Sequence, residues 1–235
     1  MPPPKGYFKG IRDLCNKYGI LLHLDEIMCG VGRTGTYFAF EQEGDVSPDL
    51  VTIGKGLGGG YVPISGMLVS RKMVDALQSG TGQINHGQTF QAHPVACAAA
   101  LAVQAIVKRE GLAARAAEMG LTLSRALSGA FAGCKYVGDI RGRGLFWGLE
   151  FVRDKETKEP LEPSFGFGSR VQQAAFELGV AVYPGAGTAD GVRGDHVMVC
   201  PPLNVSMEDM ETAVKVLRQA YDEVEACHDN LVKKP

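Results

Sequence analysis

The sequence has no excess of charge of one sign, no long hydrophobic run and no signal-peptide core. Its 235 residues carry 24 Lys and Arg against 26 Asp and Glu, so the net charge of -2 offers no basic surface for nucleic acid or acidic lipid. No apolar stretch reaches the ~18 residues that a membrane-spanning helix needs. The start, Met1-Pro-Pro-Pro-Lys5, lacks the apolar core of a signal peptide. These absences predict a soluble, cytoplasmic protein without nucleic-acid or membrane partners, and they leave a mitochondrial location open.

Closely spaced cysteine pairs are absent too. The six cysteines are scattered without a C-x-x-C pair, which predicts a reduced compartment and packing roles rather than disulfides or a zinc site. His86 and His93 have no third ligand at a useful spacing, so we expect no metal. The cysteines are Cys15, Cys29, Cys97, Cys134, Cys200 and Cys227.

Short apolar runs alternate with stretches of helical periodicity, which predicts an α/β architecture. A helix expected over residues 8–18 precedes the apolar run 20–24, which ends in the acids Asp25 and Glu26, as the carboxyl end of a buried parallel strand does. A second run, 50–53, leads into Gly54-Lys55-Gly56, and a third, 64–69, is expected to be a strand of the same kind.

The second half of the chain is predicted to form a separate domain. Two helices are expected from Pro94 and from Leu112, and we place a domain boundary near residue 112, between residues 1–112 and 113–235. Beyond it, the patterns predict one or two strands over residues 137–152, strands at 180–183 and 197–200, and helices at 169–178 and 206–227. The polar tail, residues 228–235, is expected to fray.

Two glycine-rich segments invite a nucleotide-binding interpretation that their contexts do not support. Residues 30–35 match G-x-G-x-x-G, but the acids intervene after the strand and no clear helix follows to hold a pyrophosphate. Around Lys55, a Walker sequence would need the glycines before the lysine and a Ser or Thr directly after it, where Gly56 stands.

Lys55 has a glycine on either side at a strand end, where backbone could approach a ligand closely. A partly desolvated amine there would be a nucleophile towards an aldehyde, although a solvated loop lysine is the commoner case. Asp25, at the end of a neighbouring strand, needs a cation or strong donors. A protonated pyridine nitrogen is one such partner, and a helix N-cap or an ion pair with Arg33 are alternatives. Pyridoxal phosphate needs both a lysine and such an acid.

A third candidate is Thr89. It lies ahead of the Ala-rich helix, where a hydroxyl, unpaired N–H groups and the helix dipole would stabilise an anion such as a phosphate. The alternative is that Thr89 or His93 caps the helix.

With these features, the chain resembles the class III aminotransferases, pyridoxal-phosphate enzymes of the aspartate-aminotransferase-like fold (fold type I), over nearly all its length. Three blocks in order carry the resemblance: Leu24 to Gly35, Pro48 to Gly60, and Gln88-Thr89-Phe90 with His93 to Cys97. The resemblance implies the C-terminal part of a large α/β domain in residues 1–112, a small α+β domain in residues 113–235, and a homodimer with a shared active site.

The resemblance also implies roles for single residues. Asp25 would pair with the pyridine nitrogen of pyridoxal 5'-phosphate, Ile27 would pack on the ring, and Lys55 would form the Schiff base with the aldehyde. Thr89 would bind the phosphate across the dimer interface. The implied reaction is transamination between an amine or ω-amino acid and a keto acid or aldehyde.

The substrate class rests on two methionines. Met198 stands where many relatives that act on amino acids have a carboxylate-binding arginine, and Met28 stands where several have a glutamine, so we favour the ω-transaminase type. Arg193 is a candidate substrate-carboxylate ligand, or alternatively a surface loop arginine.

The resemblance further implies that an N-terminal half, which supplies a phosphate cup and a ring-stacking aromatic residue, precedes the first residue of this chain. Its absence would impair activity and expose sheet edges. Two other functions therefore stay open: a pyridoxal-phosphate aminomutase or decarboxylase, and an inactive fragment that only pairs with a full-length subunit.

Overall fold

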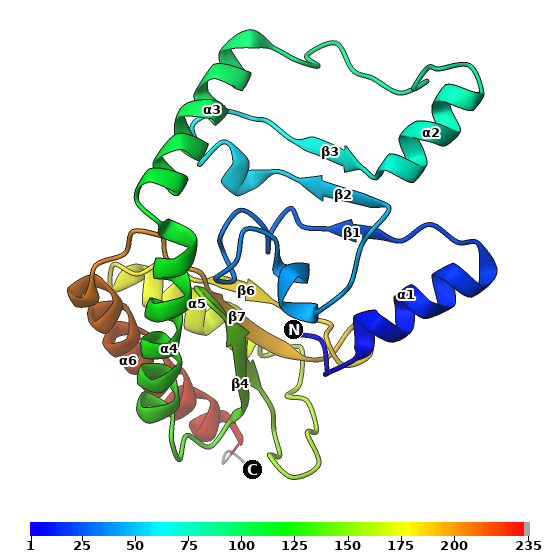
Figure 1. Ribbon diagram of the computed structural model, residues 1–235. Helices are drawn as coiled ribbons and strands as arrows, with labels where there is room; N and C mark the ends of the chain where they lie inside the picture. Colours follow the sequence, from blue (N-terminus) through cyan, green and yellow to red (C-terminus); the bar gives the residue numbers. More distant parts are fainter. Residues whose placement is uncertain (233–235) are drawn as a thin grey trace. The chain divides into compact units, whose positions relative to one another are not determined.

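The computed structural model describes residues 1–232, which form two compact units (Figure 1). The N-terminal unit comprises Pro3–Ala116, and the C-terminal unit comprises the residues from Ala117 onward together with Met1 and Pro2. The correspondence of these units to the two domains implied by the resemblance stays a prediction.

A three-stranded sheet in the order β1-β2-β3 organises the N-terminal unit. Strand β1 pairs with β2 in parallel, whereas β3 pairs with β2 antiparallel. The expectation that β3 is a third buried parallel strand is therefore wrong, because the β2–β3 connection holds no crossover helix long enough to return the chain in parallel. The elements are α1 (Tyr7–Tyr18), β1 (His23–Asp25), η1 (Ala39–Glu43), β2 (Leu50–Ile53), η2 (Lys55–Leu57), β3 (Gly66–Val69), α2 (Arg71–Ser79) and α3 (Pro94–Arg109), after which α4 (Leu112–Ala130) begins.

Helix α1 ends at Gly19, which adopts a left-handed φ of 66° and donates its N–H to the Cys15 carbonyl. The chain then turns directly into β1, whose Leu24 is buried. This brings one face of α1 against the strand and forms a core cluster of Cys15, Leu22, Leu24 and Val46, packed by Phe8, Ile11 and Phe40. The cluster anchors the strand that ends in Asp25.

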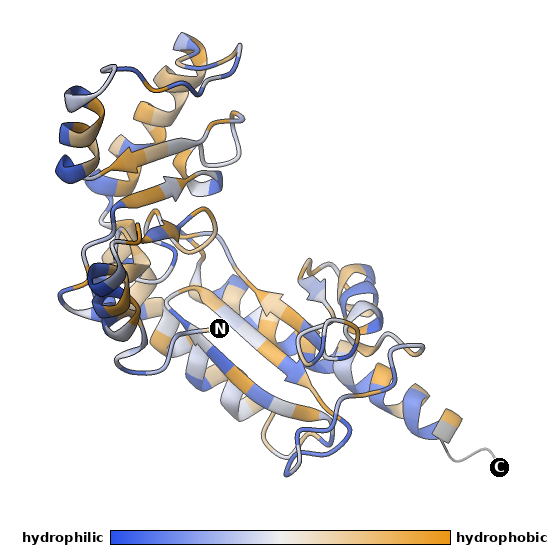
Figure 2. Cartoon of the chain, turned by 90° about the vertical axis from the view of Figure 1, so that its right-hand side faces the viewer, coloured by the Kyte–Doolittle hydropathy of each residue, from blue (hydrophilic) through white to orange (hydrophobic). Residues whose placement is uncertain are grey.

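The C-terminal unit contains an antiparallel sheet in the order β4-β5-β7-β6. Buried and less buried residues alternate along β7, and bands of contrasting hydropathy run along the strands of this sheet in Figure 2. Helix α5 packs against β6, β7 and α6. The strand expected at 180–183 is displaced, since β6 begins only at Tyr183, where pairing with β7 starts. The elements are β4 (Val137–Arg143), β5 (Phe146–Phe151), α5 (Phe167–Glu177), β6 (Tyr183–Gly185), β7 (Asp195–Val199) and α6 (Met207–Val232).

Gly120 marks the closest backbone approach of α4 to the sheet. A Cβ atom added at Gly120 would lie 2.3 Å from the Gly144 carbonyl oxygen, a separation that real Cβ atoms do not reach. A glycine in the middle of a helix is normally unfavourable. Here it lets the helix pack directly against the β4–β5 turn.

The polar end of the chain does not begin to fray at residue 228. Helix α6 continues to Val232, and His228 is buried against the rings of Tyr136 and Phe165, at centroid distances of 4.9 and 4.8 Å. The expectation was wrong for residues 228–232 because this aromatic cluster covers the polar turn. The remainder of the expected tail, residues 233–235, lies outside the described residues.

Acidification is expected to destabilise the C-terminal unit through this histidine. Burial lowers the pKa of His228 from its ordinary value of about 6.5, and its Nδ1 atom has no hydrogen-bond partner among residues 1–232. The unfolded chain therefore takes up the proton first, so the stability of the folded state falls as the pH drops below about 6.5. We expect urea denaturation at pH 7.5 and 5.5 to show this loss, and His228→Phe to reduce it. An equal loss in the variant would contradict the prediction.

The packing role expected for the cysteines is confirmed for some of them and wrong for others. Cys15 and Cys134 are buried, as expected, whereas Cys200 and Cys227 are exposed, so a packing role is wrong for these two.

None of the helices within residues 1–232 is long and apolar enough to cross a membrane.

Candidate active site

Asp25 and Lys55 lie at the carboxyl ends of neighbouring strands, at the same edge of the N-terminal sheet. Asp25 is the last residue of β1 and pairs with Thr52 of the parallel strand β2, and Lys55 comes three residues after Thr52. Both residues are exposed. Because β1 and β2 run in the same direction, their carboxyl ends present the acid and the amine at one edge, where open α/β sheets bind ligands.

Lys55 has a strained backbone conformation. Its φ is +41°, in the left-handed region that non-glycine residues rarely adopt, and it opens the short 3-10 helix η2. The turn closes through hydrogen bonds from Leu57 N–H to the Gly54 carbonyl and from Gly58 N–H to the Lys55 carbonyl, at 2.9 and 3.2 Å. A Cβ atom at Gly58 would lie 2.7 Å from the Val62 carbonyl oxygen, so a side chain there would break this tight turn. Strain of this kind is concentrated at functional sites.

Asp25 is oriented by its own turn. Its Oδ1 atom accepts a hydrogen bond of 2.9 Å from the Ile27 N–H. The residues that follow form turns rather than a helix, so the N-cap alternative for Asp25 is wrong. Ile27 is half-buried, and its Cγ2 atom lies 3.4 Å from where a Cβ of Gly54 would be, directly before Lys55.

Glu26 has a structural role that the sequence analysis missed. It is 3% exposed, and its carboxylate accepts hydrogen bonds from the N–H groups of Ala39 and Phe40 at 2.8 and 3.0 Å. Burial and this carboxylate raise the pKa of Cys29 to about 12, so the thiol stays protonated. The alternation of the strand was the available signal: Leu22, Leu24 and Glu26 share the buried face, whereas Asp25 points to the other side.

Thr89 lies in the turn 88–91, closed by a 3.0 Å hydrogen bond from Gln91 N–H to the Gln88 carbonyl. Helix α3 begins only at Pro94, and the side chain of its N-cap residue, His93, makes no capping hydrogen bond. The capping alternative is therefore wrong. Thr89 is exposed, and no hydrogen bond within residues 1–232 joins it to Asp25 or Lys55.

Arg193 belongs to the C-terminal unit, in the loop before β7. Its guanidinium pairs with Asp190 at 2.7 Å and with Glu159 at 3.2 Å, and its hydrogen bond to Asp190 raises its pKa. Both local carboxylates would have to release the guanidinium before it could bind a substrate. Its role as a substrate ligand stays a prediction.

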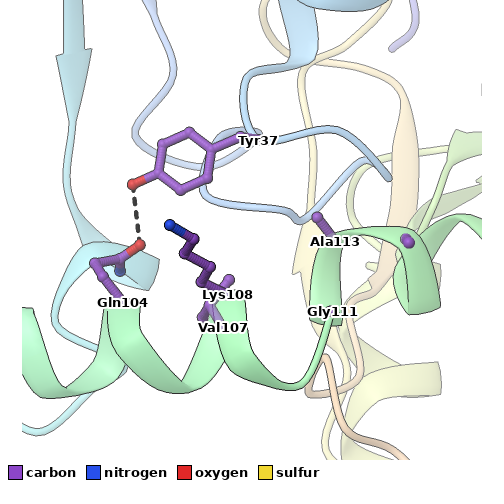
Figure 3. Close-up of a pocket in the computed structure, with 7 residues that line it drawn as sticks. Tyr37, Gln104, Val107, Lys108, Gly111 and Ala113 are labelled. Atoms are coloured by element: carbon purple, nitrogen blue, oxygen red, sulfur yellow. Dashed lines mark hydrogen bonds between the residues drawn. The ribbon is translucent and has the colours of Figure 1, made fainter.

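A separate pocket of about 370 Å³ lies within the N-terminal unit and does not include Asp25 or Lys55. Figure 3 shows Tyr37, from the loop after β1, facing Gln104 of α3, with the Lys108 amine beside them. The pocket is lined by Tyr37, Gln104, Val107, Lys108, Gly111, Ala113 and Ala114.

The residues at the sheet edge fit pyridoxal phosphate in their chemistry. The Lys55 amine makes no ion pair or hydrogen bond within the described residues and is available to an aldehyde. Asp25 offers an exposed carboxylate to a protonated ring nitrogen, and Ile27 offers an apolar side chain to a ring face. The three come from two adjacent strand ends.

Known proteins resemble this chain over most of its length. The Aminotransferase class-III family profile matches residues 1–221. An uncharacterised aminotransferase of Schizosaccharomyces pombe is 51% identical over 92% of this chain and 47% of its own length. The diaminobutyrate–2-oxoglutarate transaminase of Halomonas elongata is 39% identical over 95% of this chain and 47% of its own length. This chain thus spans about half the length of these relatives.

The fold agrees as well. The structure of an amine transaminase from an uncultivated Pseudomonas species, in its pyridoxal-phosphate-bound form, matches with a TM-score of 0.85 and 35% identity, over 94% of this chain and 49% of that one. The mixed α/β fold is therefore that of about half a transaminase. Members of the family use pyridoxal phosphate and transaminate amines and ω-amino acids. The chain belongs to the class-III aminotransferase family.

Proposed function

We propose that this chain carries the cofactor-binding lysine and acid of a pyridoxal-phosphate transaminase, which moves an amino group from an amine or ω-amino acid to a keto acid or aldehyde. The observation that supports it most is the exposed pair of Asp25 and Lys55 at the carboxyl ends of two adjacent parallel strands. Such a pair suits a ligand that needs an amine and an acid together.

When bound, pyridoxal phosphate supplies an aldehyde and a protonated ring that accepts electrons. Lys55 Nζ would hold the cofactor by its aldehyde carbon, and the same amine, when free, would carry the proton of the substrate carbon that bears the nitrogen. The Asp25 carboxylate would keep the proton on the ring nitrogen, held in place by the Ile27 N–H. Ile27 would exclude water from a ring face, and Thr89 would donate its hydroxyl to the phosphate.

The proposed substrate class rests on Met28, Met198 and a relative's substrates. Met28 is 44% exposed beside the Asp25 turn, and Met198 lies in β7. Neither thioether provides a cation for the α-carboxylate of an ordinary amino acid. The absence of a cation at either position favours donors whose amino group is distant from a carboxylate, or that have no carboxylate. The Halomonas relative is a diaminobutyrate transaminase.

The test is amino transfer by the purified chain with pyridoxal phosphate. We expect diaminobutyrate or a simple amine to lose its amino group beyond one equivalent of the added pyridoxal phosphate only when 2-oxoglutarate or pyruvate is present, and borohydride to fix a pyridoxyl label on Lys55. Product that exceeds the pyridoxal phosphate without an acceptor would favour the aminomutase or decarboxylase alternative. Absence of both label and product would leave only the fragment that pairs with a full-length subunit.

The shared-site homodimer forms part of the same proposal. The exposed apolar side chains of β3, Met67 at 47% and Leu68 at 46%, support a further contact for this sheet. Light scattering during size exclusion, with and without pyridoxal phosphate, tests the dimer. A monomer in both conditions would exclude a shared site.

A further inference from the structure

Gln104, a residue of α3 outside the three sequence blocks, links the turn that carries Lys55 to the loop that follows Asp25. Its side-chain Nε2 donates to the carbonyl oxygens of Leu57 at 3.0 Å and of Gly56 at 3.4 Å, both within η2. Its Oε1 accepts a hydrogen bond of 2.9 Å from the Tyr37 hydroxyl. The amide therefore uses its donor side for the Lys55 turn and its acceptor side for the loop after β1 (Figure 3).

The turn that Gln104 binds needs an external restraint. The left-handed conformation of Lys55 costs free energy, and backbone hydrogen bonds within a few residues close the turn. The Lys55 carbonyl accepts the Gly58 N–H and the Gly56 carbonyl accepts the Gly59 N–H, whereas the Leu57 carbonyl, among residues 1–232, accepts a hydrogen bond from Gln104 alone. Removing the Gln104 amide would leave this carbonyl without its protein partner.

Tyr37 holds the amide in its orientation. The Gly56 and Leu57 carbonyls can only accept, so the Gln104 Nε2 faces η2, and the Tyr37 hydroxyl keeps the amide there by donating to the Oε1 atom on its other side. The Tyr37 carbonyl also accepts the Gly32 N–H at 3.2 Å, within the glycine-rich loop that follows Asp25. Val31 of that loop is 2% exposed and lies 3.3 Å from where a Cβ of Gly56 would be. The two strand-end loops are thus joined by Val31 packing on one side and by the Tyr37–Gln104 bridge on the other.

We infer that Gln104 is a positioning residue that holds the Lys55 turn in place, with Tyr37 orienting its amide. That Gln104 holds the Lys55 turn is inferred from the hydrogen bonds alone. That this helps Lys55 to react with the cofactor rests on the proposed function. Gln104 would act through the backbone of η2 and would touch neither cofactor nor substrate.

The first test needs no cofactor. In the full chain, we expect Gln104→Met and Gln104→Glu to raise amide hydrogen exchange in residues 55–61 by about tenfold, the effect of losing one hydrogen bond. Methionine has a similar shape but no donor, and glutamate keeps an acceptor for Tyr37 while placing oxygens against the η2 carbonyls. Tyr37→Phe should give a smaller rise, because the amide remains but is no longer oriented.

Gln42 provides a matched control in the same unit. Its amide makes three hydrogen bonds, to the Thr34 carbonyl and to the hydroxyls of Thr34 and Thr36, and none to η2. Gln42→Met should lower the thermal midpoint comparably without raising exchange in residues 55–61. Unchanged exchange in Gln104→Met, or an equal rise across the whole N-terminal unit, would overturn the inference.

The second test uses pyridoxal phosphate and borohydride. The share of pyridoxyl label found on Lys55, relative to all other lysines, should fall several-fold in Gln104→Met and stay at the parent value in Gln42→Met. An undiminished Lys55 share in Gln104→Met would overturn the inference. If the parent itself carries no label at Lys55 but Gln104→Met still loosens residues 55–61, the positioning stands and the proposed function fails.

Discussion

Lys55→Ala is expected to abolish the pyridoxyl label at that position and to lower the rate of amino transfer by about 10³-fold. Lys55 is an exposed amine at the carboxyl end of β2, held in a strained turn and without a polar partner within residues 1–232. Alanine removes both the nucleophile and the proton carrier. Lys55→Arg should be equally inactive, because a guanidinium keeps the charge but stays protonated and cannot replace the amine.

Peptide mass spectrometry after borohydride reduction measures the label, and product formation with an acceptor measures the rate. Lys215→Ala is the matched control, since Lys215 is an exposed lysine of α6 in the other unit. Its removal should change neither quantity. A label that persists in full on another lysine of Lys55→Ala, with amino transfer unchanged, would contradict the assignment of Lys55.

Asp49→Ala is expected to destabilise the N-terminal unit by about 3–5 kcal/mol, the usual cost of breaking a buried ion pair from one side. Asp49 is 6% exposed, and its Oδ2 accepts hydrogen bonds of 2.8 Å from both Arg12 Nη1 and the Leu22 N–H. Although burial raises the pKa of Asp49, the hydrogen bonds from Leu22 and Arg12 outweigh it and lower the pKa overall. Alanine would leave the Leu22 N–H without its acceptor and the buried Arg12 guanidinium without its carboxylate, although Arg12 Nη1 would still donate to the Ser47 carbonyl at 3.2 Å.

Because single domains are stable by only about 5–15 kcal/mol, this loss should unfold a large part of the population. Urea denaturation followed by circular dichroism measures it. Asp13→Ala is the control, because it removes the exposed Lys9–Asp13 ion pair, at 2.7 Å, from α1, the helix that carries Arg12. It should change the free energy of unfolding little. If Asp49→Ala were no less stable than Asp13→Ala, the pair would not hold α1 to the sheet.

The lowered pKa of Asp49 also sets the direction of a pH effect. A carboxyl group whose pKa is lower in the folded state stabilises the fold fully above its unfolded value, about 3.9, and less as the pH falls through the folded value. Below about pH 4 the difference in stability between the parent and Asp49→Ala should therefore shrink.

Local patterns were sufficient for most elements and for the candidate residues. Helical spacing and Gly19 predicted α1, the apolar run 50–53 predicted β2, and Pro94 predicted the start of α3, because caps, turns and periodicity act over a few residues. The places of Asp25 and Lys55 could likewise be predicted, since Asp25 ends its apolar run and Lys55 follows its own run after a single glycine.

Only the tertiary structure decided features that depend on distant partners. The direction of β3, the burial of His228 and the close approach of Gly120 to Gly144 arise from pairing and packing across the chain. Gln104 reaches the Leu57 carbonyl over 47 residues, and Arg12 reaches Asp49 over 37. A residue's own neighbours in sequence cannot determine which buried donor meets which acceptor, because that choice is made when separate elements pack together.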